Sequence, residues 1–125
     1  MKTKFVTVGI RVKDLQKSID FYVKLLGMKI VGRGKLEETK GEWVELVSEK
    51  DGIILELSYY EAASPYHVEY LVSEGLDHLT FKVNTLNEAL EKIESAGYPV
   101  KEEQEEEKFR WAYVVDPNGI WVQFY

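Results

Sequence analysis

The chain contains two halves with the same order of sequence features, and this internal repeat is the strongest constraint on its fold. The segment TVGIRVKDLQKSI, residues 7–19, aligns with HLTFKVNTLNEAL, residues 78–90. Farther along, WVELVSEKDGIILEL, residues 43–57, aligns with WAYVVDPNGIWVQF, residues 111–124, after a one-residue gap. Because these segments recur in the same order, duplication explains the pattern better than a chance likeness of short amphipathic stretches.

Each half predicts one strand, one helix and then two or three further strands. Apolar and polar residues alternate over residues 6–12, which predicts the first strand. Asp14 is placed to cap the helix that follows, and Gly27 and Gly97 suit the left-handed position that ends a helix. Hairpin turn signals are KDG (50–52) and DPNG (116–119). The same element order is therefore predicted twice.

The predicted fold is α+β, with two tandem βαβββ modules that form a curved, mostly antiparallel sheet with a concave pocket. We expect one domain over residues 1–125, with module 1 at about 1–58, a connector at 59–76 and module 2 at about 77–125. A chain of 125 residues is long enough to bury a real core.

Composition excludes several classes of function. The net charge of −6 argues against nucleic acid or an anionic membrane as the main partner. The chain has no cysteine, which excludes disulfides, thiolate metal sites and cysteine nucleophiles. GRGK (32–35) lacks the spacing of a phosphate loop, so no nucleotide cofactor is expected. No membrane span and no signal peptide are evident, and we expect a cytoplasmic location.

Strand parity places four polar positions on the sheet face away from the helices. In its strand, His78 alternates with apolar residues that should face the helices, so His78 points the other way. Thr7 is the repeat partner of His78, and Gln123 is the repeat partner of Glu56. These four residues therefore occupy equivalent positions on one face.

The same parity can put large aromatic side chains on this face. They are Trp43, Trp111, Tyr113, Trp121 and Tyr125. Three tryptophans on an open sheet would form an unusual exposed apolar patch, so a substrate pocket or a subunit interface explains them better. Further tyrosines lie in and near the connector, at positions 59, 60, 66 and 70, where they would stack on a planar ligand or pack in the core or at a dimer interface.

These residues carry a resemblance to a known family. The stretch IRVKDLQKSIDFYVKLLGMKI (10–30) resembles the first module of the glyoxalase, bleomycin-resistance and extradiol-dioxygenase superfamily, also called vicinal oxygen chelate. GLDHLTFKVNTLNEALEKIESAGYPV (75–100) and WAYVVDPNGIWVQFY (111–125) resemble its second module. The resemblance implies paired βαβββ modules, a concave active site, a small-molecule ligand and a homodimer, in which the pocket lies within one chain or is shared across the dimer.

The resemblance also implies a metal site. Metal-using members take ligands from the first and last strands of each module, and these positions fall on Thr7, Glu56, His78 and Gln123. The first position is commonly His or Gln and is Thr7 here; the last is commonly Glu and is Gln123 here. Glu56 and His78 remain as strong ligands for Zn²⁺, Ni²⁺, Co²⁺ or Mn²⁺. The alternative is that they hydrogen-bond across the pocket floor.

Two functions remain open at this point. The first is a metal-dependent lyase or isomerase similar to lactoylglutathione lyase, in which bidentate chelation of vicinal oxygens stabilises an enediolate and Glu56 is the base. The second is a metal-free drug- or metabolite-binding protein of the bleomycin-resistance type. Arg33 or Arg110 would pair an anionic substrate in either case, or simply lie on the surface.

Overall fold

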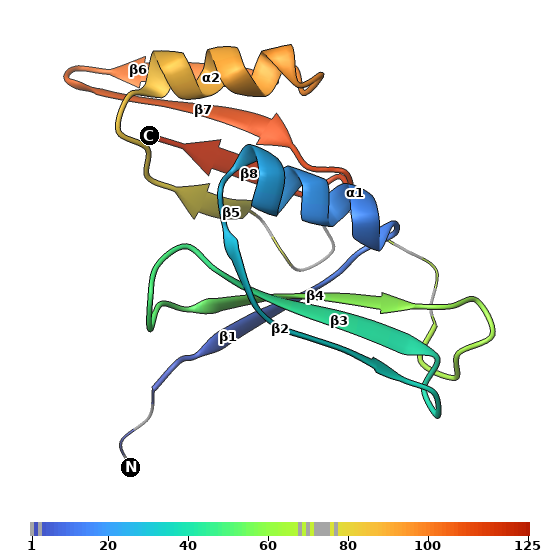
Figure 1. Cartoon of the computed structure of the whole chain (residues 1–125). Helices are drawn as coiled ribbons and strands as arrows, with labels where there is room; N and C mark the ends of the chain where they lie inside the picture. The colour runs from blue at the N-terminus through green and yellow to red at the C-terminus, as the bar shows by residue number, and fades with distance from the viewer. Residues whose placement is uncertain (1, 3, 68, 70, 72–75, 77) are drawn as a thin grey trace. The chain divides into compact units, whose positions relative to one another are not determined.

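The computed structural model shows two compact units, Met1–Tyr70 and Leu71–Tyr125 (Figure 1). The residues that it describes are 2, 4–67, 69, 71, 76 and 78–125. Each unit has one strand, one helical segment and three further strands in that order. The element order that the repeat predicts is therefore confirmed.

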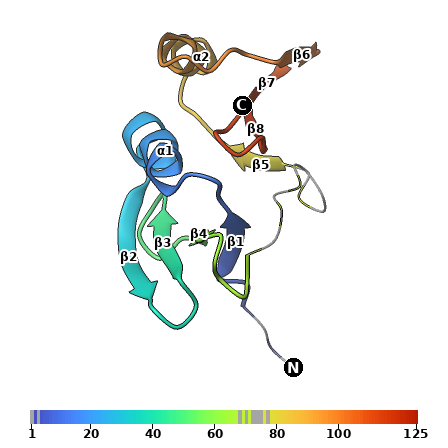
Figure 2. The same ribbon diagram turned by 90° about the vertical axis from the view of Figure 1, so that its right-hand side faces the viewer.

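The first unit is a four-stranded sheet with one helical segment. Its elements are β1 (Thr7–Arg11), α1 (Leu15–Ile19) with a π-helical continuation (Asp20–Leu25), β2 (Lys29–Leu36), β3 (Gly41–Val47) and β4 (Ile54–Tyr60). The strand order is β1-β4-β3-β2, so β1 and β2 form the two edges (Figure 2). β1 is parallel to β4, and the other two pairs are antiparallel.

The helical segment begins and ends where the sequence indicates. The Asp14 carboxylate accepts a hydrogen bond from the Lys17 backbone N–H at 3.0 Å, which caps the first turn. Gly27 follows the last turn with φ +79°, a conformation that glycine adopts without steric cost. Between these ends, the aromatic rings of Phe21 and Tyr22 are fully buried and meet edge to face. They anchor the helical segment in the core.

The core of the first unit follows the predicted alternation. Its buried apolar residues are Ile10, Val12, Leu15, Ile19, Phe21, Tyr22, Met28, Val44, Leu46, Val47, Leu55 and Leu57. Helix α1 contacts β4, so one face of the sheet is covered. Val6 and Ile53 are more than half exposed, because each precedes its strand.

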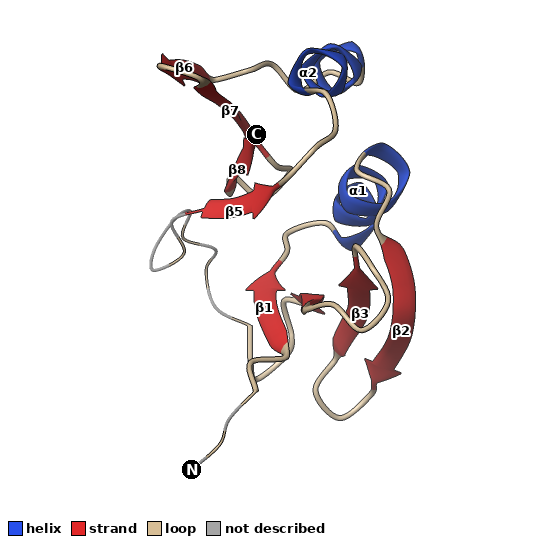
Figure 3. Ribbon diagram, turned by 90° about the vertical axis from the view of Figure 1, so that its left-hand side faces the viewer, coloured by secondary structure: helices blue, strands red, loops and turns tan. Residues whose placement is uncertain are grey.

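The second unit repeats this architecture. Its elements are β5 (His78–Phe81), α2 (Leu86–Ser95), β6 (Glu102–Glu106), β7 (Phe109–Val115) and β8 (Trp121–Phe124). The strand order is β5-β8-β7-β6 (Figure 3). β5 is parallel to β8, and the other two pairs are antiparallel. Both sheets are thus mostly antiparallel, as predicted.

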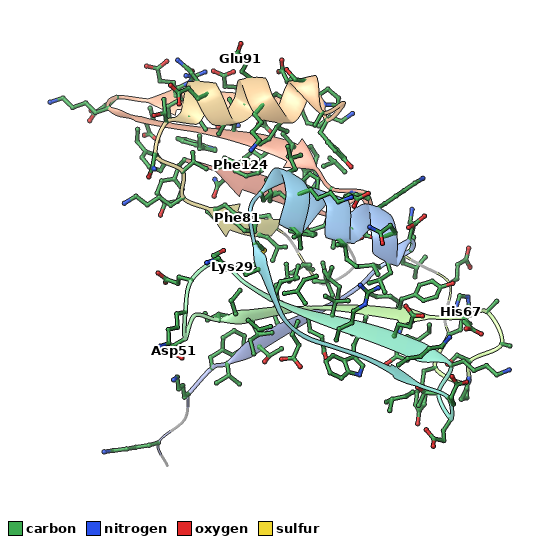
Figure 4. All side chains as sticks on the ribbon, viewed as in Figure 1. Lys29, Asp51, His67, Phe81, Glu91 and Phe124 are labelled. Carbon is green, nitrogen blue, oxygen red and sulfur yellow. The ribbon has the colours of Figure 1, made fainter. Side chains whose placement is uncertain are left out.

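The inward faces of β7 and β8 form the core of the second unit. Buried and half-buried residues alternate without interruption from Trp111 to Phe124. The rings of Phe81 and Phe124 stack with centroids 6.0 Å apart (Figure 4). Leu90 and Ile93 provide the buried side of α2. In the part of the chain that the structure describes, no helix is long and apolar enough to cross a membrane.

The connector is shorter than the sequence indicates. The predicted connector includes Tyr59 and Tyr60, but both belong to β4 and pair with β3. The Ser64 hydroxyl, which is buried, donates a hydrogen bond to the backbone carbonyl of Thr39. This hydrogen bond links the start of the connector to the turn between β2 and β3. Tyr70 lies outside the described residues.

The DPNG turn is built around a buried carboxylate. Asp116, 4% exposed, accepts hydrogen bonds from the backbone N–H groups of Asn118 and Ile120, each at 2.8 Å. The Asn118 side-chain amide donates to the other Asp116 oxygen at 2.9 Å. Gly119 adopts φ +86°, which completes the reversal. The carboxylate therefore satisfies the donors that the turn leaves unpaired.

We predict that Asp116→Ala destabilises the protein by about 2–4 kcal/mol, because hydrogen bonds to a charged group are lost and the buried donors are left unpaired. Urea denaturation followed by circular dichroism measures the change. Glu38→Ala, in the exposed β2–β3 turn, is the control and should change the free energy of unfolding by less than about 0.5 kcal/mol. A loss equal to the control would contradict this account of the turn.

Candidate functional site

The first sheet carries a row of neighbouring residues on the face away from its core. Strand pairing sets Gly9 beside Glu56, Glu56 beside Glu45, and Glu45 beside Gly32. Paired residues share a face, and so do residues two apart in a strand, so Thr7 lies on this face as well. We call it the site face of the first sheet. The predicted parity of Thr7 and Glu56 is therefore correct.

Glu56 is half-buried near the middle of this face. Among the described residues, its carboxylate has no hydrogen-bond or ion-pair partner. A Cβ atom added at Gly9 would lie 3.6 Å from Glu56 Oε2, so the carboxylate extends over the neighbouring strand. Because no side chain of the described residues bonds this carboxylate, it is available to a ligand.

Trp43 lies over the two glycines of β2. It pairs with Gly34, where an added Cβ atom would come within 2.5 Å of Trp43 Cζ2. At Gly32 an added Cβ atom would lie 3.3 Å from Trp43 Cζ3. Gly32 and Gly34 thus leave space on the site face of β2, and the indole ring of Trp43 fills that space.

A cavity of about 290 Å³ opens on this face. It is lined by Leu36, Thr39, Gly41, Glu42, Trp43, Glu56, Ser58 and Tyr60. Leu36, Trp43 and Tyr60 give the cavity apolar and aromatic walls, and polar side chains make up much of the rest of its lining. Its volume suits only a small ligand, since small-molecule pockets usually measure about 300–1,000 Å³. Trp43 and Glu56 are thus both parts of one cavity within the first unit.

Arg11 is a functional candidate that the sequence analysis did not select. It lies two residues after Gly9, on the site face, and its guanidinium carbon is 5.2 Å from the Tyr60 ring centroid. Arg11 Nη1 is buried and, among the described residues, has no hydrogen-bond partner. Strand parity alone would have identified it. By contrast, Arg33 is exposed, and Arg110 donates hydrogen bonds to Glu103 and Asn87.

In the second sheet, we call the face that carries His78 and Gln123 the site face, and it contains a chain of hydrogen bonds. The Thr80 hydroxyl donates to Gln123 Oε1 at 3.0 Å, and Gln123 Nε2 donates to the Tyr113 hydroxyl at 2.9 Å. The Tyr113 ring meets the rings of His78 and Trp121 edge to face, each with centroids 5.9 Å apart. His78, Gln123, Tyr113 and Trp121 are therefore neighbours, as parity predicts.

The remaining predicted aromatic residues belong to the same face. Trp111 and Tyr125 each lie 5.4 Å, between ring centroids, from Phe109. Phe109 was not predicted as a site residue, although it lies two residues before Trp111 in β7 and therefore shares its face. The structure thus brings Thr7, Glu56 and Trp43 together in one unit. In the other unit it brings together His78, Gln123 and the remaining predicted aromatics.

Two tandem βαβββ modules with a polar and aromatic sheet face define a glyoxalase-like protein. The chain belongs to the Glyoxalase/Bleomycin resistance protein/Dioxygenase superfamily, whose family model matches residues 4–124. The resemblance inferred from the sequence is thereby confirmed.

Known proteins that the chain resembles include lactoylglutathione lyases. It is 33% identical to the enzyme of Escherichia coli O157:H7, an alignment that covers 91% of this chain and 85% of the relative. It is 30% identical to the enzyme of Pseudomonas aeruginosa, with 91% and 77% covered. Among solved structures, the trypanothione-dependent glyoxalase I of Leishmania major is 28% identical, with a TM-score of 0.80 and with 98% of this chain and 86% of that chain covered.

We predict that Gly34→Ala displaces Trp43, because the new methyl group would overlap the indole ring. In a Trp111→Phe, Trp121→Phe background, the emission maximum of Trp43 should shift, and stability should fall by about 1–3 kcal/mol. Gly9→Ala is the matched control, since its methyl group would be in ordinary contact with Glu56 Oε2. Unchanged Trp43 emission in Gly34→Ala would contradict the placement of the ring.

Proposed function

We propose that this protein is a divalent-metal-dependent lyase or isomerase that acts on a small substrate with vicinal oxygens. The observation that carries the proposal is Glu56, a half-buried carboxylate without a local partner on the wall of a ligand-sized cavity. The similarity to lactoylglutathione lyases supports the reaction class.

The proposed ion would be Zn²⁺, Ni²⁺, Co²⁺ or Mn²⁺, although no three His, Asp or Glu side chains of the described residues form a ligand cluster. Glu56 and His78 would be the strong ligands, because carboxylate oxygen and imidazole nitrogen suit all four ions. Gln123 Oε1 accepts one hydrogen bond from Thr80 and keeps a second lone pair for an ion. Thr7 would be a weak fourth ligand. When bound, such an ion supplies Lewis-acid stabilisation of charge on oxygen.

The protein's own residues would bind and orient the substrate. Arg11 presents a buried guanidinium nitrogen without a partner among the described residues, which suits a carboxylate or phosphate of the ligand. Trp43 and Tyr60 line the cavity and would exclude water from it. The reaction also needs a base to move a proton next to a carbonyl group, and Glu56 would serve as that base.

The proposed ligands divide evenly between the two units, with Thr7 and Glu56 in the first and His78 and Gln123 in the second. We propose a homodimer, as the family resemblance implies. In it, the site is completed either within one chain or by the second unit of the partner subunit. We also propose a cytoplasmic location.

We predict that Glu56→Gln abolishes stabilisation by metal, since an amide is a much weaker ligand than a carboxylate. The wild-type melting temperature should rise on addition of Ni²⁺, Zn²⁺, Co²⁺ or Mn²⁺, and protein purified without chelator should contain metal by elemental analysis. Glu38→Gln, the same change in an exposed turn, should respond as the wild type does. An equal thermal shift in wild type and Glu56→Gln would remove Glu56 from the metal site.

We predict that Arg11→Gln weakens binding of an anionic ligand by about 10- to 100-fold, the effect of losing a charge-assisted hydrogen bond. Glutathione is a suitable probe because it carries carboxylates, and isothermal titration calorimetry measures its affinity. Arg33→Gln, at an exposed position, should bind as the wild type does. Equal affinities of Arg11→Gln and Arg33→Gln would show that Arg11 does not contact the anion.

A second candidate function is metal-free binding of a planar drug or metabolite. The hydrogen-bonded set of Thr80, Gln123 and Tyr113 favours it, because Gln123 is already satisfied on both sides of its amide. The aromatic side chains around it would stack on a planar ligand. Metal-free wild-type protein that shows no thermal shift with the four ions, and Glu56→Gln protein that still binds such a ligand, would favour this function.

A further inference from the structure

We propose that Tyr60 is a positioning residue for Arg11. Its ring supports the guanidinium by the face and leaves the N–H groups of the guanidinium free for an anionic group of the ligand. This inference rests on the proposed function, in which Arg11 binds such a group, and it involves no metal ion. In that function Tyr60 only lines the cavity and excludes water. Its contacts assign it a second role.

The Tyr60 ring lies against the charged end of Arg11. Arg11 pairs with Ser58 in the register of β1 and β4, so Tyr60, two residues after Ser58, is a neighbour on the same face. The Arg11 guanidinium carbon lies over the ring, 5.2 Å from its centroid. A cation within about 6 Å of a ring centroid is attracted to the face of the ring. The ring therefore holds the guanidinium.

This kind of support leaves the donors of Arg11 unused. A guanidinium carries its N–H donors in its plane, whereas an aromatic ring attracts its face. Arg11 Nη1 is buried and, among the described residues, has no hydrogen-bond partner. A carboxylate in place of the ring would attract the same charge, but it would accept those hydrogen bonds itself. Tyr60 thus fixes the cation without competing for its donors.

Arg110 shows the opposite arrangement in the second unit. Its Nε donates a hydrogen bond to Glu103 Oε1 at 2.8 Å, its Nη2 donates to the same oxygen, and its Nη1 donates to Asn87 Oδ1. Each nitrogen of that guanidinium is therefore used within the unit. An unpaired buried donor costs free energy, so the arrangement at Arg11 is explained better by ligand binding than by stability.

The Tyr60 ring is itself positioned by the neighbouring strand. Tyr60 pairs with Gly41 across β4 and β3, and a Cβ atom added at Gly41 would lie 2.9 Å from Tyr60 Cε1. The ring therefore occupies the space that a side chain at position 41 would take. Tyr66 adds a second ring contact, with centroids 5.9 Å apart. Gly41 thus determines where the ring lies, and the ring determines where the guanidinium lies.

The support places the cation beside one end of the cavity. Ser58, which pairs with Arg11, and Tyr60 both line the cavity, and so does Glu56. Ser58 and Glu56 are two residues apart in β4, so their positions are about 6.5 Å apart along the strand. An anionic group that is bound by Arg11 would therefore lie next to Ser58 and Tyr60, away from the like charge of Glu56.

The first test measures glutathione affinity by isothermal titration calorimetry. Tyr60→Leu should weaken binding about 3- to 30-fold, the effect of losing a cation–π contact. Tyr60→Phe keeps the ring and should bind within about twofold of the wild type. Tyr59→Leu is the matched control, because Tyr59 lies on the opposite face of β4 and does not line the cavity. It should bind as the wild type does.

Double variants distinguish support of Arg11 from direct contact with the ligand. Gly41→Ala alone should weaken binding, because the new methyl group displaces the ring. In the Arg11→Gln background, neither Gly41→Ala nor Tyr60→Leu should weaken it further, since both act through Arg11. Proton NMR of the free protein gives a separate signature. The Arg11 side-chain resonances, shifted upfield by the ring, should move downfield in Tyr60→Leu but not in Tyr60→Phe.

The outcomes separate this inference from the proposed function. Wild-type affinity in folded Tyr60→Leu, or in Gly41→Ala should Tyr60→Leu not fold, would overturn the role of Tyr60 and leave the anion contact of Arg11 intact. So would an equal loss from Tyr60→Leu with and without Arg11. Wild-type affinity in Arg11→Gln, or wild-type protein that does not bind glutathione, would refute the anion contact of the proposed function and the role of Tyr60 with it.

Discussion

The register between β1, β4 and β3 is the constraint on which the candidate site depends. It sets Gly9, Glu56 and Glu45 side by side, and the period of two along each strand then fixes which other residues share their face. A slip of one residue in β4 would replace Glu56 with a buried leucine on this face. The buried Leu55 and Leu57 therefore oppose such a slip, because a shift of one residue would expose both of them.

The two units use one architecture for different chemistry. In the second, a hydrogen-bonded row of neutral side chains is surrounded by aromatic rings, and its geometry is determined by its own contacts. In the first, Glu56 lines a cavity without a hydrogen-bond or ion-pair partner among the described residues, whereas Glu42 in the same lining pairs with Lys35. The two units thus use equivalent register positions differently: Gln123 is hydrogen-bonded within its own sheet, whereas Glu56 has no such partner among the described residues.

The sequence predicted the fold, and it predicted which sheet face each side chain occupies. It predicted less well which side chains of adjacent strands are neighbours. Parity placed Glu56, Trp43 and Gln123 correctly, because burial of one sheet face imposes it on every strand. The pairing of Glu45 with Glu56 depends on hairpin length, and the contact of Trp43 with Gly34 depends on a bulge between Ile30 and Gly32. Alternation does not encode either feature. Convergence of Glu56 and His78 on one ion stays a prediction, since it depends on packing between units.

The glycines beneath Trp43 have a consequence for the range of ligands that this scaffold can accept. Gly32 and Gly34 of β2 place no side chain beneath the Trp43 ring. The depth of the cavity therefore depends on how close this ring lies to the β2 backbone. A single methyl group on the edge strand would lift that ring without altering any polar residue. The packing of the Trp43 ring and the position of the Glu56 carboxylate are thus set by different strands, β2 and β4, so a change in the edge strand can reshape the cavity while Glu56 stays in place.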